Sequence, residues 1–251
     1  MRIRFPGSSS CIPDPGTDTS CLLINDHLLI DTGWAPVLRM NQMGIDPLNV
    51  DTILFSHFHA DHYLGLVQLL FFLGLRVPAD ADEPQRQPLI AGPGEHLERV
   101  VLAAQDYLQP ERFPRLRLAP RLHPLAPGDG LDVGGLRIEV AAARHTSSAG
   151  IPEPSLAYRV SEDESGGSFF FSGDTHPCPE LAEAAHGVQL LIHDGAHSSP
   201  EEAAQTALRS EAVQLILTHI AAAQSTEMVE RARAVFANTR AADPDLVVEL
   251  P

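Results

Sequence analysis

The stretch Ser56-His57-Phe58-His59-Ala60-Asp61-His62 places four potential metal ligands within six consecutive positions. The apolar run at 50–55 directly before it predicts a buried strand, and the apolar run at 64–72 directly after it predicts a buried helix. The stretch therefore lies at the carboxyl end of a strand, where α/β folds place their sites. Four such side chains at one junction indicate a metal site rather than scattered surface histidines.

The spacing within this stretch predicts which side chains act together. In an extended segment His57 and His59 project to one side, while Phe58 projects to the other. The turn that follows directs Asp61 and His62 toward a second point close by. Imidazole and carboxylate ligands suit zinc, and also manganese or iron. One stretch thus offers two ligands to each of two neighbouring ions.

Length and composition predict an ordinary globular protein. The 251 residues are enough for one sizeable domain and short for two, so we expect a single domain over residues 1–251. No apolar run is long enough to cross a membrane, and the N-terminal residues lack the apolar core of a signal peptide. The expected location is therefore the cytoplasm, without membrane contact.

The charge balance limits the expected partners. The formal net charge is −16, with 17 Lys and Arg against 33 Asp and Glu. A large structured RNA requires a basic surface, so it is not the expected partner. A small phosphorylated substrate remains compatible, because bound divalent cations supply local positive charge.

Apolar runs along the rest of the chain predict two kinds of structural unit. Residues 131–143 alternate around a Gly-Gly turn and residues 156–171 alternate around an acidic turn, so each segment predicts an antiparallel hairpin. Other strands are followed by helices, as at 188–192 and 200–208. Together these units predict an α/β fold with two mixed sheets between helical layers. Residues Arg76 to Pro88, rich in proline, acid and alanine, predict a surface excursion.

Three further side chains each stand at the end of an apolar strand. They are His145, Asp174 and His219. Together with the opening stretch they complete two ion sites. His57, His59 and His145 would bind one ion, and Asp174 would bridge it to a second. The following residues would bind the second ion: Asp61, His62 and His219. Two ions about 3.5–4 Å apart are a common hydrolytic arrangement.

Two features allow more than one interpretation. Asp31 follows a buried strand and could belong to the site, but a structural carboxylate that hydrogen-bonds the ligand-bearing loop is the favoured interpretation. The segment 109–121 holds a local concentration of arginines. A solvated loop is favoured there over a phosphate-binding surface.

This ligand set resembles that of the metallo-β-lactamase-fold superfamily. The residues that carry the resemblance run in family order over most of the chain: Asp31-Thr32-Gly33, His57-x-His59-x-Asp61-His62, His145, Ser172-Gly173-Asp174-Thr175 and Thr218-His219. The resemblance implies a four-layer αββα sandwich, with two mixed sheets flanked by helices and a dinuclear site at their shared edge.

A finer resemblance points to the ribonuclease Z and phosphodiesterase branch of that superfamily. Leu190-Leu191-Ile192-His193-Asp194 looks like its strand-end His-Glu stretch, and His197-Ser198-Ser199 looks like its His-Ser-Thr motif. The resemblance implies that Asp194 holds His197, which contacts phosphate or protonates the leaving oxygen. Asp194 stands where that branch has Glu, and its spacing to His197 is tighter. The interval from His145 to Ser172 is too short for the arm that grips transfer RNA.

The favoured hypothesis is a dinuclear metal-dependent phosphodiesterase acting on a small or cyclic phosphodiester. Its expected cofactors are two divalent ions, most readily Zn²⁺, with Mn²⁺ or iron as alternatives. Asp61 would ligate one ion and orient the nucleophile, and His197, held by Asp194, would assist the leaving group. The alternatives are a hydrolase of lactones, thioesters or lactams, and a non-catalytic or redox metal-binding protein of the same fold. The resemblance also allows a homodimer.

Overall fold

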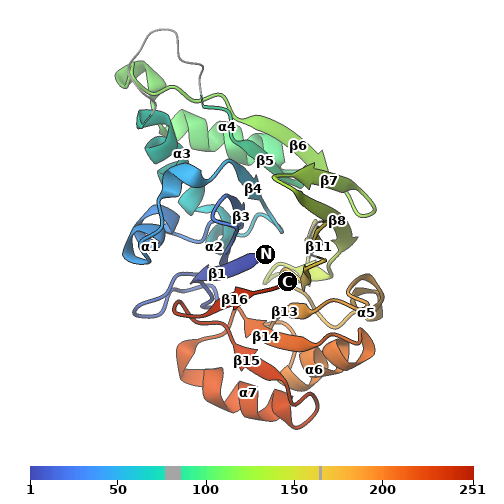
Figure 1. Cartoon of the computed structure of the whole chain (residues 1–251). Coiled ribbons are helices and arrows are strands. Elements are labelled where there is room, and N and C mark those ends of the chain that lie inside the picture. The colour runs from blue at the N-terminus through green and yellow to red at the C-terminus, as the bar shows by residue number, and fades with distance from the viewer. Residues whose placement is uncertain (77–85, 164–165) are drawn as a thin grey trace.

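The computed structural model describes residues 1–76, 86–163 and 166–251 of the chain (Figure 1). Its first large sheet has the strand order β16-β1-β2-β3-β4-β5-β6. The strands of this sheet are β1 (Arg2–Gly7), β2 (Cys21–Ile24), β3 (Leu28–Ile30), β4 (Thr52–Leu54), β5 (Leu89–Pro93), β6 (Arg121–Leu125) and β16 (Val247–Glu249). Pairing is antiparallel from β16 to β3 and parallel from β3 to β6, so the sheet is mixed.

The second large sheet has the order β15-β14-β13-β12-β11-β8-β7. Its strands are β7 (Gly130–Val133), β8 (Leu136–Ala142), β11 (Leu156–Glu162), β12 (Ser168–Phe171), β13 (Leu190–Asp194), β14 (Gln214–Thr218) and β15 (Thr239–Ala241). Strands β12 to β15 are parallel, and the pairs β7–β8, β8–β11 and β11–β12 are antiparallel. Both hairpins that the alternating pattern predicts are therefore present.

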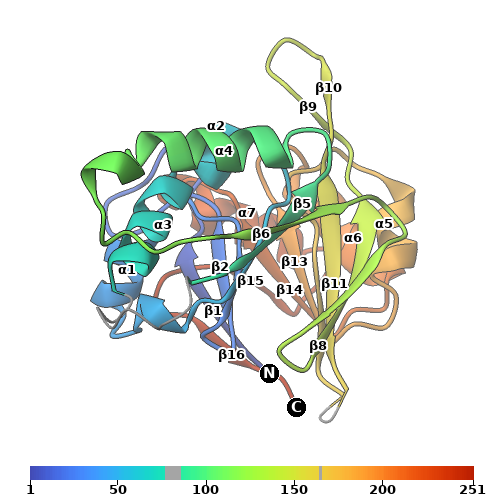
Figure 2. The same cartoon turned by 90° about the horizontal axis from the view of Figure 1, so that it is seen from above.

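Seven α-helices in the described residues cover the outer faces of the two sheets (Figures 1 and 2). Those of the first half are α1 (Pro36–Gln42), α2 (Ala60–Tyr63), α3 (Gly65–Leu75) and α4 (Leu97–Tyr107). Those of the second half are α5 (Pro179–Ala184), α6 (Pro200–Arg209) and α7 (Ser225–Arg233). Short 3-10 turns lie at Pro47–Asn49, Pro110–Arg112 and Ala222–Gln224. None of the helices in the described part of the chain has the length and apolar character needed to traverse a bilayer.

Three apolar clusters hold these layers together. The central cluster joins side chains of both sheets, such as Ile3 and Phe5 from β1 with Phe169 from β12. A second cluster packs α1, α3 and α4 on the first sheet, and a third packs α5, α6 and α7 on the second. Burial of apolar side chains on both faces of each sheet is the driving force for this arrangement. The expected four-layer αββα sandwich is confirmed.

Two short elements differ from the expectation. The solvated loop expected at 109–121 is wrong at its last residue, because Arg121 begins strand β6, which pairs in parallel with β5. Its polar sequence and Pro124 hide it from pattern analysis, but β6 lies at the sheet edge, where a proline is tolerated. A two-stranded ribbon also forms from β9 (His145–Thr146) and β10 (Pro152–Glu153) and projects from the molecule (Figure 2). The expected excursion at Arg76 to Pro88 lies mostly outside the described residues, at 77–85.

Candidate metal centre

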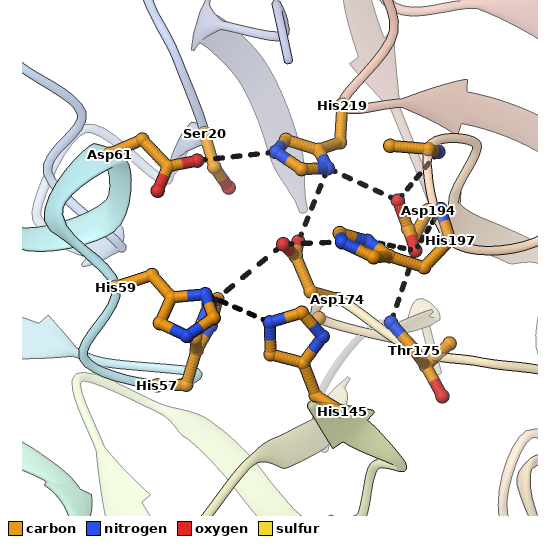
Figure 3. Close-up of polar contacts among 12 residues, drawn as sticks. Ser20, His57, His59, Asp61, His145, Asp174, Thr175, Asp194, His197 and His219 are labelled. Carbon is orange, nitrogen blue, oxygen red and sulfur yellow. Dashed lines mark hydrogen bonds and ion pairs between the residues drawn. The ribbon is translucent and has the colours of Figure 1, made fainter. Parts of the chain in front are cut away.

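The loops that follow the parallel strands of both sheets converge on one cluster of histidines and aspartates (Figure 3). The loop after β4 carries His57 and His59, and the first turn of α2 carries Asp61 and His62. Asp174, Asp194 and His219 follow or end β12, β13 and β14. Parallel strands end at the same edge, and this explains why residues far apart in sequence meet here.

The first expected ligand group is His57, His59 and His145. One nitrogen from each lies within 4.8 Å of the others. Nδ1 of His59 and Nε2 of His145 are 2.9 Å apart. These three side chains can therefore face one ion.

The second expected ligand group is Asp61, His62 and His219, which also lies within 4.8 Å. Oδ2 of Asp61 is 3.3 Å from Nε2 of His219 and 3.4 Å from Nε2 of His62. Asp174 lies between the two groups, with Oδ2 3.4 Å from Nε2 of His62 and 3.9 Å from Nε2 of His57. The structure thus brings together all seven expected metal ligands.

The chemistry of these atoms fits bound cations. Nε2 of His57 and Nε2 of His62 are buried and make no hydrogen bond within the described part of the chain. The nearest carboxylate oxygens, on Asp61 and Asp174, are 3.4–3.9 Å away, which is longer than the usual N–H···O distance of about 2.7–3.2 Å. Unpaired buried nitrogens are costly, and an ion between them and the carboxylates would satisfy both.

The electrostatics favour the same conclusion. Burial opposes ionisation of Asp174, but His219 and His62 lower its pKa well below the usual value. Burial lowers the pKa of His57, so its neutral imidazole keeps a lone pair for a metal. Burial would also lower the pKa of His219, but Asp174 and Asp194 raise it to about 10. Such a carboxylate cluster attracts positive charge, which either protons or divalent cations can supply.

Asp31 supports the loop that carries the first ligands. Its Oδ1 accepts a hydrogen bond from the backbone N–H of Ser56 at 2.8 Å, and its Oδ2 accepts one from the Ser56 hydroxyl, also at 2.8 Å. Oδ2 also lies 2.7 Å from Nδ1 of His62. A carboxylate on Nδ1 directs Nε2 toward the site, as in carboxylate–histidine–metal arrangements. Asp31 therefore makes the contacts expected of a structural carboxylate that hydrogen-bonds the ligand-bearing loop.

Replacing Asp31 with Asn should weaken both the fold and the metal site. Asn tolerates the φ of 56° at this position, so the backbone does not account for the loss. The amide presents only one acceptor oxygen to Ser56 and His62, so we expect the free energy of unfolding to fall by about 2–3 kcal/mol. Metal affinity should fall by about 10–100-fold. Denaturant titration of the metal-free protein and competition with a chelator measure the two effects.

The matched control is Asp132→Asn, an exposed carboxylate on β7, which should change neither quantity. Unchanged metal affinity in the Asp31 variant would show that His62 does not need this carboxylate.

Asp194 and His197 come together in spite of their close spacing. Oδ2 of Asp194 is 3.0 Å from Nδ1 of His197 and accepts hydrogen bonds from the backbone N–H groups of Thr175 and His197, both at 3.1 Å. The hydrogen bond to Asp194 raises the pKa of His197. Burial raises the pKa of Asp194, but hydrogen bonds from His197 and His219 bring it down to about 2.

Asp194 also has a contact that no sequence pattern predicts. Its Oδ1 lies 3.2 Å from Nδ1 of His219, while Nε2 of His219 faces Asp61 (Figure 3). One carboxylate therefore orients an expected metal ligand and the neighbouring His197. His219 has a φ of 59°, an uncommon conformation for a non-glycine residue and typical of strained functional positions.

A solvent-accessible cleft of about 670 Å³ opens onto this cluster. Its lining includes five polar residues that no motif predicts: Thr146, Ser147, Ser148, Glu153 and His176. Nε2 of His176 is 3.1 Å from Oγ1 of Thr146, and its ring centroid is 5.7 Å from that of His197. The place of His176 directly after the Ser-Gly-Asp-Thr motif could have indicated it. The arginines of segment 109–121 are not among the described residues of this lining.

The fold and the converging imidazoles and carboxylates define the class of the protein, a metal-dependent hydrolase with the metallo-β-lactamase fold. Residues 26–220 match the family model described as Beta-lactamase superfamily domain, and the chain belongs to that family.

Individual similarities extend over the whole chain. It is 25% identical to the Ribonuclease Z of Methanosarcina mazei over 320 aligned positions, covering 100% of this chain and 98% of that protein. The crystal structure of the metallo-beta-lactamase fold protein YhfI from Bacillus subtilis superposes with a TM-score of 0.78 at 19% identity, covering 98% of each chain. The human short-form tRNase Z has a TM-score of 0.77 at 19% identity, with full coverage of both chains. These two structures share the fold.

Proposed function

We propose that this chain is a dinuclear metal-dependent phosphodiesterase that acts on a small or cyclic phosphodiester. The observation that carries the proposal is the imidazole of His197, held by Asp194 beside the seven expected ligands. Ring centroids of His197 and His145 are 4.6 Å apart, so His197 stands next to the first ligand group. The similarity to Ribonuclease Z of Methanosarcina mazei supports phosphodiesters as the substrate class.

Two Zn²⁺ ions fit this donor set best, with Mn²⁺ or iron as alternatives. His57, His59 and His145 would hold one ion, and Asp174 would bridge the two ions. The second ion would be held by Asp61, His62 and His219. When bound, such ions lower the pKa of water and neutralise charge on phosphoryl oxygens. The donor set is equally compatible with carbonyl hydrolysis, so the residues beside it must decide the substrate class.

Three side chains would act on the attacking water and on the leaving oxygen. Asp61 would accept a hydrogen bond from the attacking water and orient it toward phosphorus. His197 would donate the proton on Nε2 to the leaving oxygen, because its Nδ1 is held by Asp194. Asp194 would keep the imidazole oriented and stabilise its protonated form, as the raised pKa of His197 requires.

Three observations favour a small substrate over folded RNA. The cleft of about 670 Å³ lies within the size range of small-molecule sites. The net charge of −16 disfavours a polyanion. The alignment with the Methanosarcina mazei protein has 320 positions against 251 residues here, so that relative has segments that this chain lacks.

The decisive experiment compares substrate classes on one reconstituted sample. Metal-free protein is prepared with a chelator and titrated with Zn²⁺, Mn²⁺ or Fe²⁺, and each sample is assayed with bis(4-nitrophenyl) phosphate, a chromogenic lactam, a lactone and a precursor transfer RNA. We expect phosphodiester hydrolysis to require metal and to saturate near two ions per chain, with kcat/KM at least about 100-fold above that for the lactam or lactone. Rapid lactam or lactone hydrolysis with an inert phosphodiester would reject the proposal. Efficient cleavage of the precursor RNA would reject the small-substrate part.

A further inference from the structure

Glu153 is placed in the cleft by the register of the small β9–β10 ribbon. Glu153 pairs directly with His145, and Pro152 pairs with Thr146. Residues opposite each other in an antiparallel pair share one face of the ribbon. The side chain of His145 points into the metal centre, so the carboxylate of Glu153 lies on the same side, and both residues line the cleft.

Glu153 is a half-buried carboxylate without a partner. Within the described residues it makes no hydrogen bond and no ion pair. A carboxylate that loses part of its hydration without gaining a donor is unfavourable. Asp61, Asp174 and Asp194 have histidine partners that compensate this cost, whereas Glu153 has none. Its donor must therefore come from solvent or from a bound molecule.

The cleft that Glu153 lines presents hydroxyl groups as well as four histidines: His59, His145, His176 and His197. Thr146, Ser147 and Ser148 line the same cleft, and none of the described lining residues is Lys or Arg. Oγ of Ser147 accepts a hydrogen bond from the backbone N–H of Ile151 at 3.3 Å, so its own proton is free to donate. A carboxylate among hydroxyls accepts hydrogen bonds from alcohols and repels anions. No phenyl or indole ring stands among the described lining residues, which argues against a quaternary ammonium group.

We infer that Glu153 selects the alcohol part of the substrate: it accepts a hydrogen bond from a free hydroxyl on a sugar or polyol ester and rejects an ester that carries a second phosphate at that place. This inference rests on the proposed phosphodiesterase function and specifies its substrate class. Glu153 is thus a specificity-determining residue, separate from the groups that act on phosphorus.

The test uses two esters that differ at a single position. Thymidine 5′-(4-nitrophenyl phosphate) has a 3′-hydroxyl, and its 3′-phosphorylated analogue has a phosphate in that place. For the metal-loaded protein we expect kcat/KM to be at least about 10-fold higher for the hydroxyl ester. In Glu153→Gln the value for the hydroxyl ester should fall about 5–10-fold while that for the phosphorylated ester rises. Glu153→Lys should reverse the preference.

Opposite changes for the two esters are the diagnostic result, because a general loss of structure or metal would lower both. Glu183→Gln, which removes an exposed carboxylate from α5, is the charge-matched control and should leave the ratio as it is. Metal content and thermal unfolding are measured for each variant. An equal fall for both esters, or an unchanged ratio in both Glu153 variants, would overturn the inference while leaving the phosphodiesterase proposal intact. If the wild-type protein hydrolyses neither ester nor bis(4-nitrophenyl) phosphate, the proposed function itself fails, and this inference with it.

Discussion

Asp174→Asn should lower kcat/KM for a phosphodiester by about 1,000-fold or more, equivalent to about 4 kcal/mol of transition-state stabilisation. The carboxylate lies between the two ligand groups, with its oxygens 3.4–3.9 Å from imidazole nitrogens of His57, His62 and His219. An amide has the same shape but no charge and a single acceptor oxygen, so it cannot bridge two cations equally well. Elemental analysis after dialysis should find fewer than two ions per chain.

Asp106→Asn on α4 provides the control, because it makes the same chemical change at an exposed position. It should keep full activity and metal content. If Asp174→Asn retains two tightly bound ions and normal turnover, Asp174 is not a bridging ligand and the dinuclear arrangement is wrong.

His197→Gln should reveal a proton donor through its dependence on the leaving group. Protonation by a positioned side chain contributes about 100–10,000-fold when the leaving oxygen is an alkoxide. 4-Nitrophenolate departs without a proton, so its ester should lose far less activity. The expected result is a fall in kcat of at least about 100-fold for a dialkyl or cyclic phosphodiester and less than about 10-fold for bis(4-nitrophenyl) phosphate.

The control for this variant is His186→Gln, at an exposed position after α5. Asp194→Asn is a poor substitute, because Asp194 contacts His219 as well as His197 and its loss would also disturb an expected metal ligand. Equal losses for both classes of leaving group would exclude His197 as the proton donor and assign it to phosphate binding or to structure.

Local patterns account for the parts of this protein that the sequence predicts well. The ligand stretch at 56–62 lies between a buried strand and apolar helices, so its place at a strand end followed from the apolar runs on either side of it. The Gly-Gly turn at 134–135 predicted the β7–β8 hairpin, because its two glycines adopt positive φ values. Gly173 likewise has a φ of 58°, and a Cβ there would come within 2.8 Å of the Leu156 carbonyl oxygen. Positions that need a positive φ or have no room for a Cβ can therefore be recognised in the sequence by their glycines.

The elements that the sequence did not predict have a weak residue pattern or none. Strand β6 has little alternation of apolar and polar residues and contains Pro124, so the sequence did not predict it as a strand. Its position at the sheet edge tolerates both features. The β9–β10 ribbon has only two residues in each strand, which is too short for any periodicity. Its consequence for the cleft was equally hidden, because Glu153 belongs to no motif.

The convergence of the expected metal-ligating residues and the four-layer fold were thus predicted from the sequence, since they depend on residue type and on the order of strands and helices. Contacts across the molecule were not. The double contact of Asp194 with His197 and His219, the support of His62 by Asp31 and the exposure of Glu153 to the cleft depend on strand register and on how two sheets meet. A shift of one residue in the β9–β10 pairing would turn Glu153 away from His145, because side chains alternate between the two faces of a strand. The residues typical of a metal-dependent hydrolase are therefore visible in local sequence, whereas the proposed selection of substrate by Glu153 depends on packing.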